Sequence, residues 1–365
     1  MRILHVTDTY LPLLGGIEVL VDDLASQQRL SGHQVRVLTS TAATAPDDAA
    51  AIRLKSAVFS PLADVSAFRP DAVHCHSSIV SPLAWRTARH AALAGLPVLV
   101  TMHSMVPPAG VVPAALRRVA QAMPRSVSWS AVSAPAAEAL RPIVGSDVLV
   151  LPNGLDQESC RTASSGTNEI PLIVSVMRLA RRKRPLELIT ILSQVQALMG
   201  DRPWRAAIVG DGPLRSAVAR AIRGAGLEDH VFLTGRLTRP QIMLLLSRAD
   251  LYLSPAYLES FGIAALEARS SGLPVVAMSS GGVSDFVHNG AHGYLVRDDS
   301  AMASRTAQML ADPAALQAMG RRSLADPPDL GWASIVERSL DAYQAAGVRE
   351  PVRRLVPTGA LVTSL

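Results

Sequence analysis

Short apolar runs alternate with longer segments of helical periodicity along most of the chain. The apolar runs are nearly continuous, which is typical of parallel strands that are buried on both faces. In the first half we expect strands at residues 3–7, 34–39, 72–76, 98–102, 128–132 and 148–151. In the second half we expect them at residues 172–176, 206–209, 231–234, 251–254 and 275–277. Because helical segments separate these runs, each half is predicted to fold as an α/β sheet of βαβ units.

Turn-forming residues divide this pattern into two halves and a C-terminal segment. Pro152-Asn153-Gly154 is a turn signal, and a polar stretch without clear periodicity follows it. Asp326-Pro327-Pro328 marks a second boundary, after which residues 332–346 have the pattern of a helix. We therefore predict two Rossmann-like domains at residues 1–155 and 170–328, a helix at 329–346 that packs across the domain junction, and a mobile tail at 347–365.

The composition supports two packed domains. The chain has 365 residues, of which 49% are apolar and 18% are charged, which suits two cores at about 100–200 residues per domain. No apolar run reaches the roughly 18 residues of a membrane-spanning helix, and the first residues enter a strand rather than a signal peptide. Cys75 and Cys160 lie far apart and form no disulfide or zinc pattern. We expect a protein of the reducing cytoplasm.

Basic residues are concentrated at one place in the second half. The formal net charge is +5, and one short segment holds Arg178, Arg181, Arg182, Lys183 and Arg184. A local cluster of this kind indicates one anionic ligand rather than the broad surface that binds nucleic acid. The alternative is a solvated basic turn, and we keep that interpretation for Arg181, Arg182 and Arg184.

Two carboxylates flank a predicted helix start that is suited to an anion. Glu259 precedes Phe261-Gly262, where a helix should begin, and Glu267 lies one to two turns inside that helix. Free N–H groups and the positive end of the helix dipole bind anions, and a glycine lets a phosphate approach the backbone closely. Glu267 is then placed to accept hydrogen bonds from ribose hydroxyls, and Glu259 to meet a sugar. The alternative is two unrelated glutamates on a surface loop and helix.

The residues that follow this pair narrow the interpretation. Glu259 and Glu267 are followed by Gly272-Leu273-Pro274-Val275-Val276, by Gly281-Gly282 and by His288-Asn289-Gly290. This arrangement resembles the retaining family 4 glycosyltransferases of the GT-B fold, the glycosyl transferases group 1. The resemblance extends from Ile3 to about Tyr343. It implies two Rossmann-like domains that face each other across a cleft, with the C-terminal helix crossing back to the N-terminal domain.

The resemblance also implies roles for the domains and for the basic cluster. Residues 1–155 are implied to bind the acceptor, and residues 170–328 the nucleotide sugar. Arg178 and Lys183 are implied to hold the donor diphosphate, since fixed cations stabilise the negative charge of a leaving diphosphate. These two cations would replace a metal, and the sequence has no Asp-x-Asp motif of a metal-bridged donor site. We therefore expect no metal and no cofactor.

Further contacts are implied by position in the family pattern. The Gly15-Gly16 loop, after Leu14, is expected to approach the donor phosphate, although a plain βα turn is the alternative. The remaining donor contacts are expected from Leu237, at the nucleotide base, and from Phe261, Gly262 and Ile263 at the helix start. His103 follows a strand and is implied to touch the transferred sugar, although a lone histidine is often structural. The acceptor-side candidates are Ser104, Tyr10 and His76.

The resemblance therefore implies a hexosyltransferase that moves a sugar from UDP or GDP to a hydroxyl of a lipid, saccharide or natural-product acceptor. The resemblance implies retention at the anomeric carbon, and front-face displacement is favoured because no Asp or Glu is obvious as a nucleophile in the N-terminal motifs that face the cleft. The alternatives are a non-hydrolysing nucleotide-sugar epimerase and a non-catalytic sugar-binding protein.

The sequence indicates neither the acceptor nor the oligomeric state. Residues 112–125 have the pattern of an amphipathic helix with Arg117, Arg118 and Arg125 on it. That helix could touch the inner face of an anionic membrane, and an acceptor-binding lip or an ordinary surface helix are the alternatives.

Overall fold

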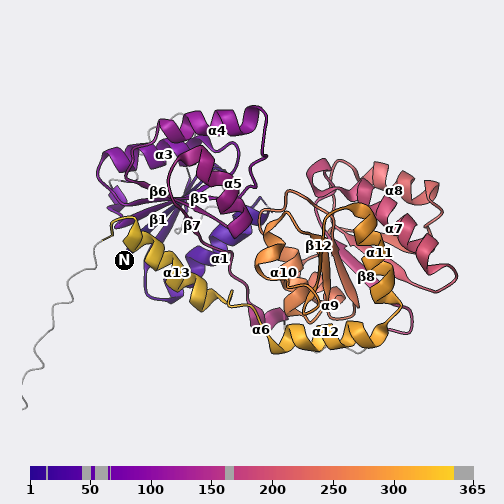
Figure 1. The fold of residues 1–365 in the computed structure, drawn as a ribbon. Coiled ribbons are helices and arrows are strands. Elements are labelled where there is room, and N and C mark those ends of the chain that lie inside the picture. Colours follow the sequence, from indigo (N-terminus) through magenta and orange to yellow (C-terminus); the bar gives the residue numbers. More distant parts are fainter. Residues whose placement is uncertain (14, 43–50, 54–64, 66, 161–167, 349–365) are drawn as a thin grey trace, which may run out of the picture.

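Two parallel sheets lie side by side, and helices cover each of them (Figure 1). The computed structural model describes residues 1–13, 15–42, 51–53, 65, 67–160 and 168–348. Leu14 of the Gly-Gly loop lies outside the described residues, as do residues 349–365 of the predicted tail. The predicted pair of Rossmann-like sheets is confirmed.

The first sheet has seven parallel strands among the described residues, in the order β3-β2-β1-β4-β5-β6-β7. Its strands are β1 (Arg2–Thr7), β2 (Gln34–Thr39), β3 (Ala51–Arg53), β4 (Ala72–Ser77), β5 (Val98–Met102), β6 (Val127–Ala131) and β7 (Val148–Val150). Its helices are α1 (Gly16–Leu30), α3 (Pro82–Leu93), α4 (Val111–Gln121) and α5 (Ala134–Val144). β4 and β5 are buried along their whole length, as their continuous apolar character requires.

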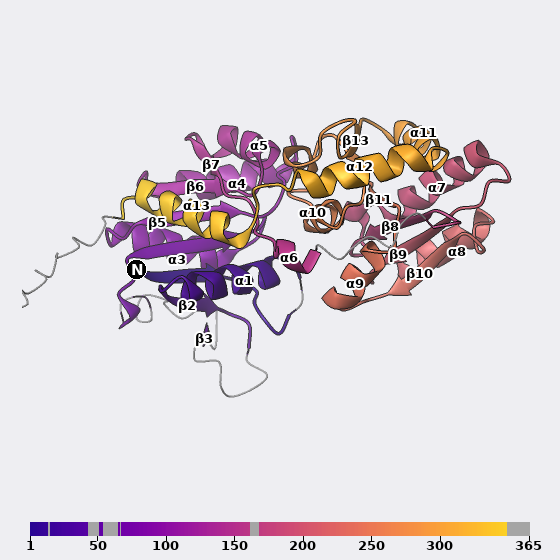
Figure 2. The same cartoon turned by 90° about the horizontal axis from the view of Figure 1, so that it is seen from below.

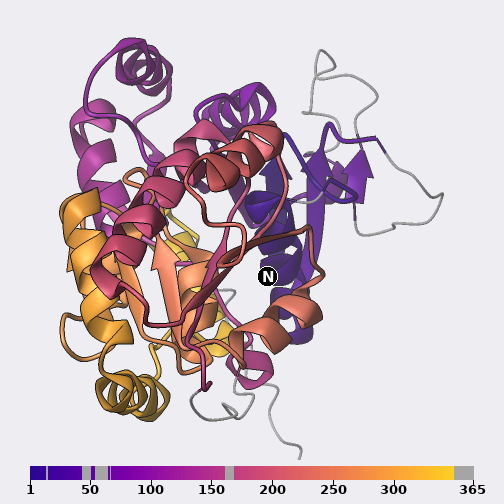
Figure 3. The ribbon, with the colours of Figure 1, turned by 90° about the vertical axis from the view of Figure 1, so that its right-hand side faces the viewer.

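The second sheet has six parallel strands in the described part of the chain, in the order β10-β9-β8-β11-β12-β13. Its strands are β8 (Leu172–Val176), β9 (Arg205–Val209), β10 (Val231–Gly235), β11 (Leu251–Ser254), β12 (Val275–Met278) and β13 (Gly293–Val296). Its helices are α7 (Pro185–Met199), α8 (Arg215–Gly224), α9 (Arg239–Leu246), α10 (Ile263–Ser270), α11 (Asp299–Leu310) and α12 (Pro313–Ala325), and Figure 3 shows helices on both faces of the sheet. The short α6 (Gln157–Cys160) lies in the connection between the two sheets.

The strand order alone indicates where a ligand would bind. The order reverses between β1 and β4 in the first sheet and between β8 and β11 in the second. In open parallel sheets, ligands bind outside the carboxyl ends of the strands at such reversals. The residues that follow β5 and β11 line one shared cavity, which is described below.

The last described helix, α13 (Trp332–Ala345), crosses from the second sheet back to the first, where Figure 2 shows it in yellow along the first lobe. Leu155 N donates a hydrogen bond of 2.9 Å to Leu330 O just before the helix begins. At the other end Tyr343 is fully buried, and its hydroxyl lies 2.9 Å from His74 Nδ1 of β4. The predicted crossing helix is confirmed.

Gly154 allows the crossing to be this close, and its substitution is our first prediction. A Cβ at Gly154 would overlap the indole ring of Trp332. Gly154→Ala is therefore expected to destabilise the protein by about 1–3 kcal/mol, because the ring or the connection must shift. Thermal unfolding measures the change, and Gly224→Ala in α8 is the control, since a Cβ there meets no atom within 4 Å. Equal melting temperatures for the two variants would contradict the tight crossing.

The predicted amphipathic helix appears as α4, which ends at Gln121. Leu116 is buried, whereas Arg117 and Arg118 are exposed. None of the helices in the described ranges combines the length and the apolar character needed to cross a bilayer. Contact of α4 with a membrane stays a prediction.

Candidate functional site

A cavity of about 260 Å³ lies between the carboxyl ends of the two sheets. The second sheet contributes Lys183, Glu259 and the residues from Ser260 to Ala265 to its wall. The first sheet contributes Gly16, Ile17 and His103, and Asn153 of the connection completes the lining. The two sheets, which are far apart in the sequence, therefore form opposite walls of a single site.

The start of α10 presents backbone N–H groups to this cavity. Gly262 precedes the helix with a left-handed φ of 95°, a conformation that favours glycine. A Cβ at Gly262 would also lie 2.7 Å from Val283 Cγ2. Phe261, which is 2% exposed, packs against Phe286 with 5.6 Å between the ring centroids and holds this turn in place. The predicted residues Phe261, Gly262 and Ile263 therefore form an anion-binding geometry.

Lys183 and Glu259 form an ion pair in the cavity. Lys183 Nζ lies 2.5 Å from Glu259 Oε2, and the side chains are 35% and 14% exposed. The lysine ends the short helical turn Arg181–Lys183, and the glutamate stands just before α10. A cation and a carboxylate are thus fixed together beside the free N–H groups of a helix.

The turn that carries Lys183 is held by its neighbours, and Arg184 is half-buried, which corrects its interpretation as solvated, whereas Arg182 is exposed as expected. Arg184 has a left-handed φ of 57°, and its guanidinium donates to both carboxylate oxygens of Asp299 at 2.9 and 2.8 Å. Arg182 donates to Leu258 O and, across the cleft, to Met105 O at 3.2 Å. A pattern of charges along the chain does not reveal these long-range partners, which is why the sequence interpretation failed for Arg184.

Two other predicted donor residues lie outside the lining of the cavity. Arg178 follows β8, is exposed, and makes no ion pair with any residue in the described ranges. Leu237 is half-buried against the apolar core of the second sheet. Their contacts with a donor stay predictions.

Glu267 is 7% exposed and has a partner that the sequence did not reveal. Arg239, at the start of α9, places Nε 3.3 Å from Glu267 Oε1, and its Nη1 lies 3.5 Å from Asp23 Oδ2 of α1. Burial raises the pKa of Glu267, and the positive charge of Arg239 opposes that rise. Arg239 therefore links a carboxylate on α1 of the first domain to one on α10 of the second. A contact of Glu267 with a ribose stays a prediction.

The N-terminal wall of the cavity is formed by His103 and the Gly-Gly loop. His103 follows β5, and its backbone N–H donates to Ser77 O at 2.8 Å. Gly16 lines the cavity, and Gly15 is the exposed residue before α1. His103 Nε2 lies 2.9 Å from His76 Nδ1, so the side chain that faces the cavity is tied to the interior of the sheet.

The acceptor-side candidates are less accessible than the sequence suggested. Tyr10 is 2% exposed, and its hydroxyl donates to Asp22 Oδ1 at 2.5 Å. His76 is also 2% exposed, and Ser104 is half-buried beside His103. None of the three lines the cavity, so their contact with an acceptor stays a prediction.

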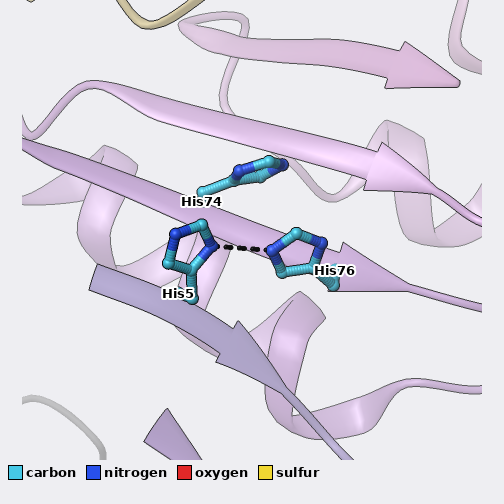
Figure 4. Close-up of side chains that lie close together, drawn as sticks. All are labelled: His5, His74 and His76. Carbon is cyan, nitrogen blue, oxygen red and sulfur yellow. Dashed lines mark hydrogen bonds between the residues drawn. The ribbon is translucent and has the colours of Figure 1, made fainter. Parts of the chain in front are cut away.

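Three buried histidines form a group that could in principle hold a metal ion. Ring nitrogens of His5, His74 and His76 lie within 4.8 Å of one another, and Figure 4 shows them converging from β1 and β4. His74 already uses both nitrogens, at 2.9 Å from Tyr343 Oη and 2.6 Å from Thr101 Oγ1. His5 and His76 lie 2.8 Å apart, a hydrogen-bond distance. The group therefore fits a hydrogen-bonded network better than a metal site.

Two family models together match most of the chain. The family described as Glycosyltransferase Family 4 matches residues 14–159, and the family described as Glycosyl transferases group 1 matches residues 158–325.

Individual relatives extend the likeness. A D-inositol 3-phosphate glycosyltransferase from Nocardia farcinica is 34% identical over 184 residues, which are 48% of this chain and only 41% of that relative. The protein of the same name from Kineococcus radiotolerans is 28% identical over 403 aligned positions, 91% of each chain. The crystal structure of Anabaena HepE with UDP-glucose has the same fold, with a TM-score of 0.78 at 20% identity over 94% of this chain and 100% of that one. Since the two family matches together run from residue 14 to residue 325, the chain belongs to the family 4 glycosyltransferases, with a group 1 module as its C-terminal half.

Proposed function

We propose that the protein is a retaining glycosyltransferase that moves a hexosyl group from a nucleotide-diphosphate sugar to an acceptor hydroxyl by front-face displacement. The observation that carries the proposal is the pair of Lys183 and Glu259, 2.5 Å apart at the N-terminus of α10, inside the cavity between the sheets. This arrangement offers positive charge for a diphosphate and a carboxylate for sugar hydroxyls at one place.

The donor diphosphate would lie against Lys183 and the first N–H groups of α10. Negative charge grows on the diphosphate as the glycosidic bond breaks, and fixed positive groups stabilise that charge. Glu259 would leave Lys183 when the diphosphate arrives and accept hydrogen bonds from the sugar. Exposed Arg178 would supply a second cation, and Glu267 would hold the ribose in exchange for part of its contact with Arg239.

We further propose that no metal takes part. Glu259 is the one carboxylate among the described residues that line the cavity, and it is already paired with Lys183. Magnesium sites commonly combine carboxylates with substrate phosphates, and a carboxylate paired with a lysine is a poor ligand for the ion.

The same lining supports front-face displacement. A double displacement requires a carboxylate beside the anomeric carbon, whereas the N-terminal wall offers Gly16, Ile17 and His103. The departing phosphate oxygen would instead take the proton of the attacking hydroxyl. Closure of the two lobes around the donor would exclude water from this transfer.

UDP is the first donor nucleotide to test, because a neighbour of the same fold binds UDP-glucose, and GDP is the second. The acceptor is proposed only as a hydroxyl of a lipid, a saccharide including an inositol phosphate, or a natural product.

A panel of UDP- and GDP-sugars tests this function. We expect one donor to raise the melting temperature, and to release its nucleotide in the presence of an acceptor extract and excess EDTA. NMR of the product should show the anomeric configuration of the donor. Binding without nucleotide release would favour a sugar-binding protein. Loss of activity with EDTA would contradict metal independence, and an inverted product would contradict retention.

A further inference from the structure

A line of hydrogen-bonded side chains runs from α13 through the first sheet to the cavity. Ser339 Oγ lies 2.6 Å from Val336 O, and Gln28 Nε2 lies 2.9 Å from Ser339 Oγ. His5 Nε2 lies 2.7 Å from Gln28 Oε1. Two histidine pairs complete the line: His5 Nδ1 with His76 Nε2 at 2.8 Å, and His76 Nδ1 with His103 Nε2 at 2.9 Å. Every member before His103 is buried.

Ser339 determines which group donates and which accepts in each hydrogen bond of the line. A carbonyl oxygen can only accept, so the single hydroxyl hydrogen of Ser339 is donated to Val336 O. Ser339 Oγ must then accept from Gln28, which places the NH₂ group of the amide at the serine and at Tyr343 Oη, 3.0 Å away. The amide oxygen therefore faces His5.

Each histidine ring then fixes the donor and acceptor of the next hydrogen bond, because a neutral imidazole has one N–H and one lone pair. His5 must donate from Nε2 to the amide oxygen, so its Nδ1 accepts from His76 Nε2. His76 Nδ1 is then the lone pair, and it accepts from His103 Nε2. Burial lowers the pKa of His5 and His103 to about 4 and that of His76 well below its usual value, which keeps the three rings neutral near pH 7.

We propose that Gln28 acts through His5 and His76 to fix His103 in the tautomer with hydrogen on Nε2, so that His103 presents an unprotonated Nδ1 to the cavity. His103 Nδ1 makes no hydrogen bond with any residue in the described ranges, and the side chain lines the cavity. Gln28, His5 and His76 are then positioning residues, and none of them lines the cavity.

The consequence for substrate concerns the direction of one hydrogen bond, and this part rests on the proposed function. An unprotonated Nδ1 accepts a hydrogen bond from a sugar hydroxyl, whereas an N–H would donate one. His103 would therefore select a hydroxyl that can donate. A fluorine or a methoxy group at the same position of the sugar cannot do so.

The tautomers can be read directly in the protein without any substrate. Long-range ¹H–¹⁵N NMR spectra of ¹⁵N-histidine-labelled protein at about pH 7.5 distinguish an Nε2–H ring from an Nδ1–H ring and from an imidazolium. We expect His5, His76 and His103 all to carry hydrogen on Nε2 alone. Hydrogen on Nδ1 of His103, a charged ring, or a metal ion bound in equal amount to the protein at His5 and His76 would overturn the proposal.

Variants far from the cavity test the coupling. Gln28→Leu removes the amide, and we expect His103 to become a mixture of both tautomers, with kcat for transfer falling about tenfold. Ser339→Ala is a milder variant and should give a smaller change in the same direction. Ser334→Ala is the matched control, because Ser334 lies on the same helix but is only half-buried, and its hydroxyl donates to Asp329 rather than to the line. An unchanged His103 spectrum in folded Gln28→Leu protein would overturn the coupling.

Donor analogues connect the spectrum to the reaction. If one sugar hydroxyl donates to His103, replacing it with fluorine should remove most of the difference in kcat between wild type and Gln28→Leu. A difference that persists with every fluorinated donor would overturn the assigned contact. The NMR experiment needs no substrate, so it tests the tautomers even if the protein proves not to be a transferase. A failure of the proposed function can therefore be distinguished from a failure of the tautomer proposal.

Discussion

Lys183→Ala is expected to lower kcat for sugar transfer by about a hundredfold to a thousandfold. The reason is that one preorganised positive group next to a developing negative charge contributes about this much in a site that excludes water. The variant should fold normally, because the Lys183 side chain is 35% exposed and its partner is a single carboxylate. Initial rates with a saturating donor, together with circular dichroism and thermal unfolding, measure both properties.

Arg181→Ala is the matched control for that experiment. Arg181 belongs to the same short turn as Lys183 but is exposed and absent from the cavity lining, so its loss should change kcat little. Equal losses in the two variants would mean that the turn acts only through its overall charge. Wild-type turnover in Lys183→Ala would remove Lys183 from the reaction altogether.

The sequence predicted most of the fold because buried parallel strands leave a strong local signal. The expected strands at residues 34–39 and 251–254 have the bounds of β2 and β11. β3 (Ala51–Arg53) and β13 (Gly293–Val296) were missed as strands. Both lie at the edges of their sheets. β3 has only three residues, and β13 begins at a glycine directly after the turn signal Asn289-Gly290, so neither stands out from a turn.

The wall of the cavity around α10 could be predicted from the sequence because its parts lie close together along the chain. Glu259 and Gly262 surround one helix start that is suited to an anion, and the motifs that follow them narrowed the interpretation. Arg239 could not be found in this way, since it contacts Glu267 and Asp23 only after both sheets have packed together.

The histidine line was also beyond sequence reasoning. His76 was predicted as an acceptor contact because it ends a strand, but its two nitrogens face His5 and His103. Gln28 and Ser339 stand at opposite ends of the sequence, and only the crossing of α13 brings them to 2.9 Å. Polar residues on a buried helix face carry no sign of their partners until the tertiary fold is known.

Acidification from about pH 7 to about pH 5 is expected to destabilise the protein through these same histidines. Burial is the main cause that lowers the pKa of His5 and His103 from 6.5 to about 4, and it also lowers the pKa of His74 and His76. Above pH 6.5 the histidines are neutral in both states, so they add no pH dependence. Between 6.5 and about 4 the unfolded chain binds protons that the folded protein does not, so stability falls as the pH falls.

The size of this effect makes it measurable. Each such histidine contributes about 1.4 kcal/mol per pH unit, so His5 and His103 alone sum to about 4 kcal/mol at pH 5. That loss is comparable with the whole stability of many proteins, about 5–15 kcal/mol. The buried carboxyl of Glu267 has a raised pKa and acts in the opposite direction, but its usual value of 4.5 places that gain toward the acid end of the range.

Thermal unfolding in a pH series between about 7 and 5.5 isolates the histidine contribution. His103→Gln should give a shallower fall of the melting temperature, because one proton uptake of the unfolded state is removed. Exposed His288 provides the matched control, and His288→Gln should keep the wild-type slope. A wild-type melting temperature that stays constant over this range would show that the folded protein takes up these protons as readily as the unfolded chain does. The histidine rings could then not all be neutral in the folded protein, and the proposed order of donors and acceptors would be wrong.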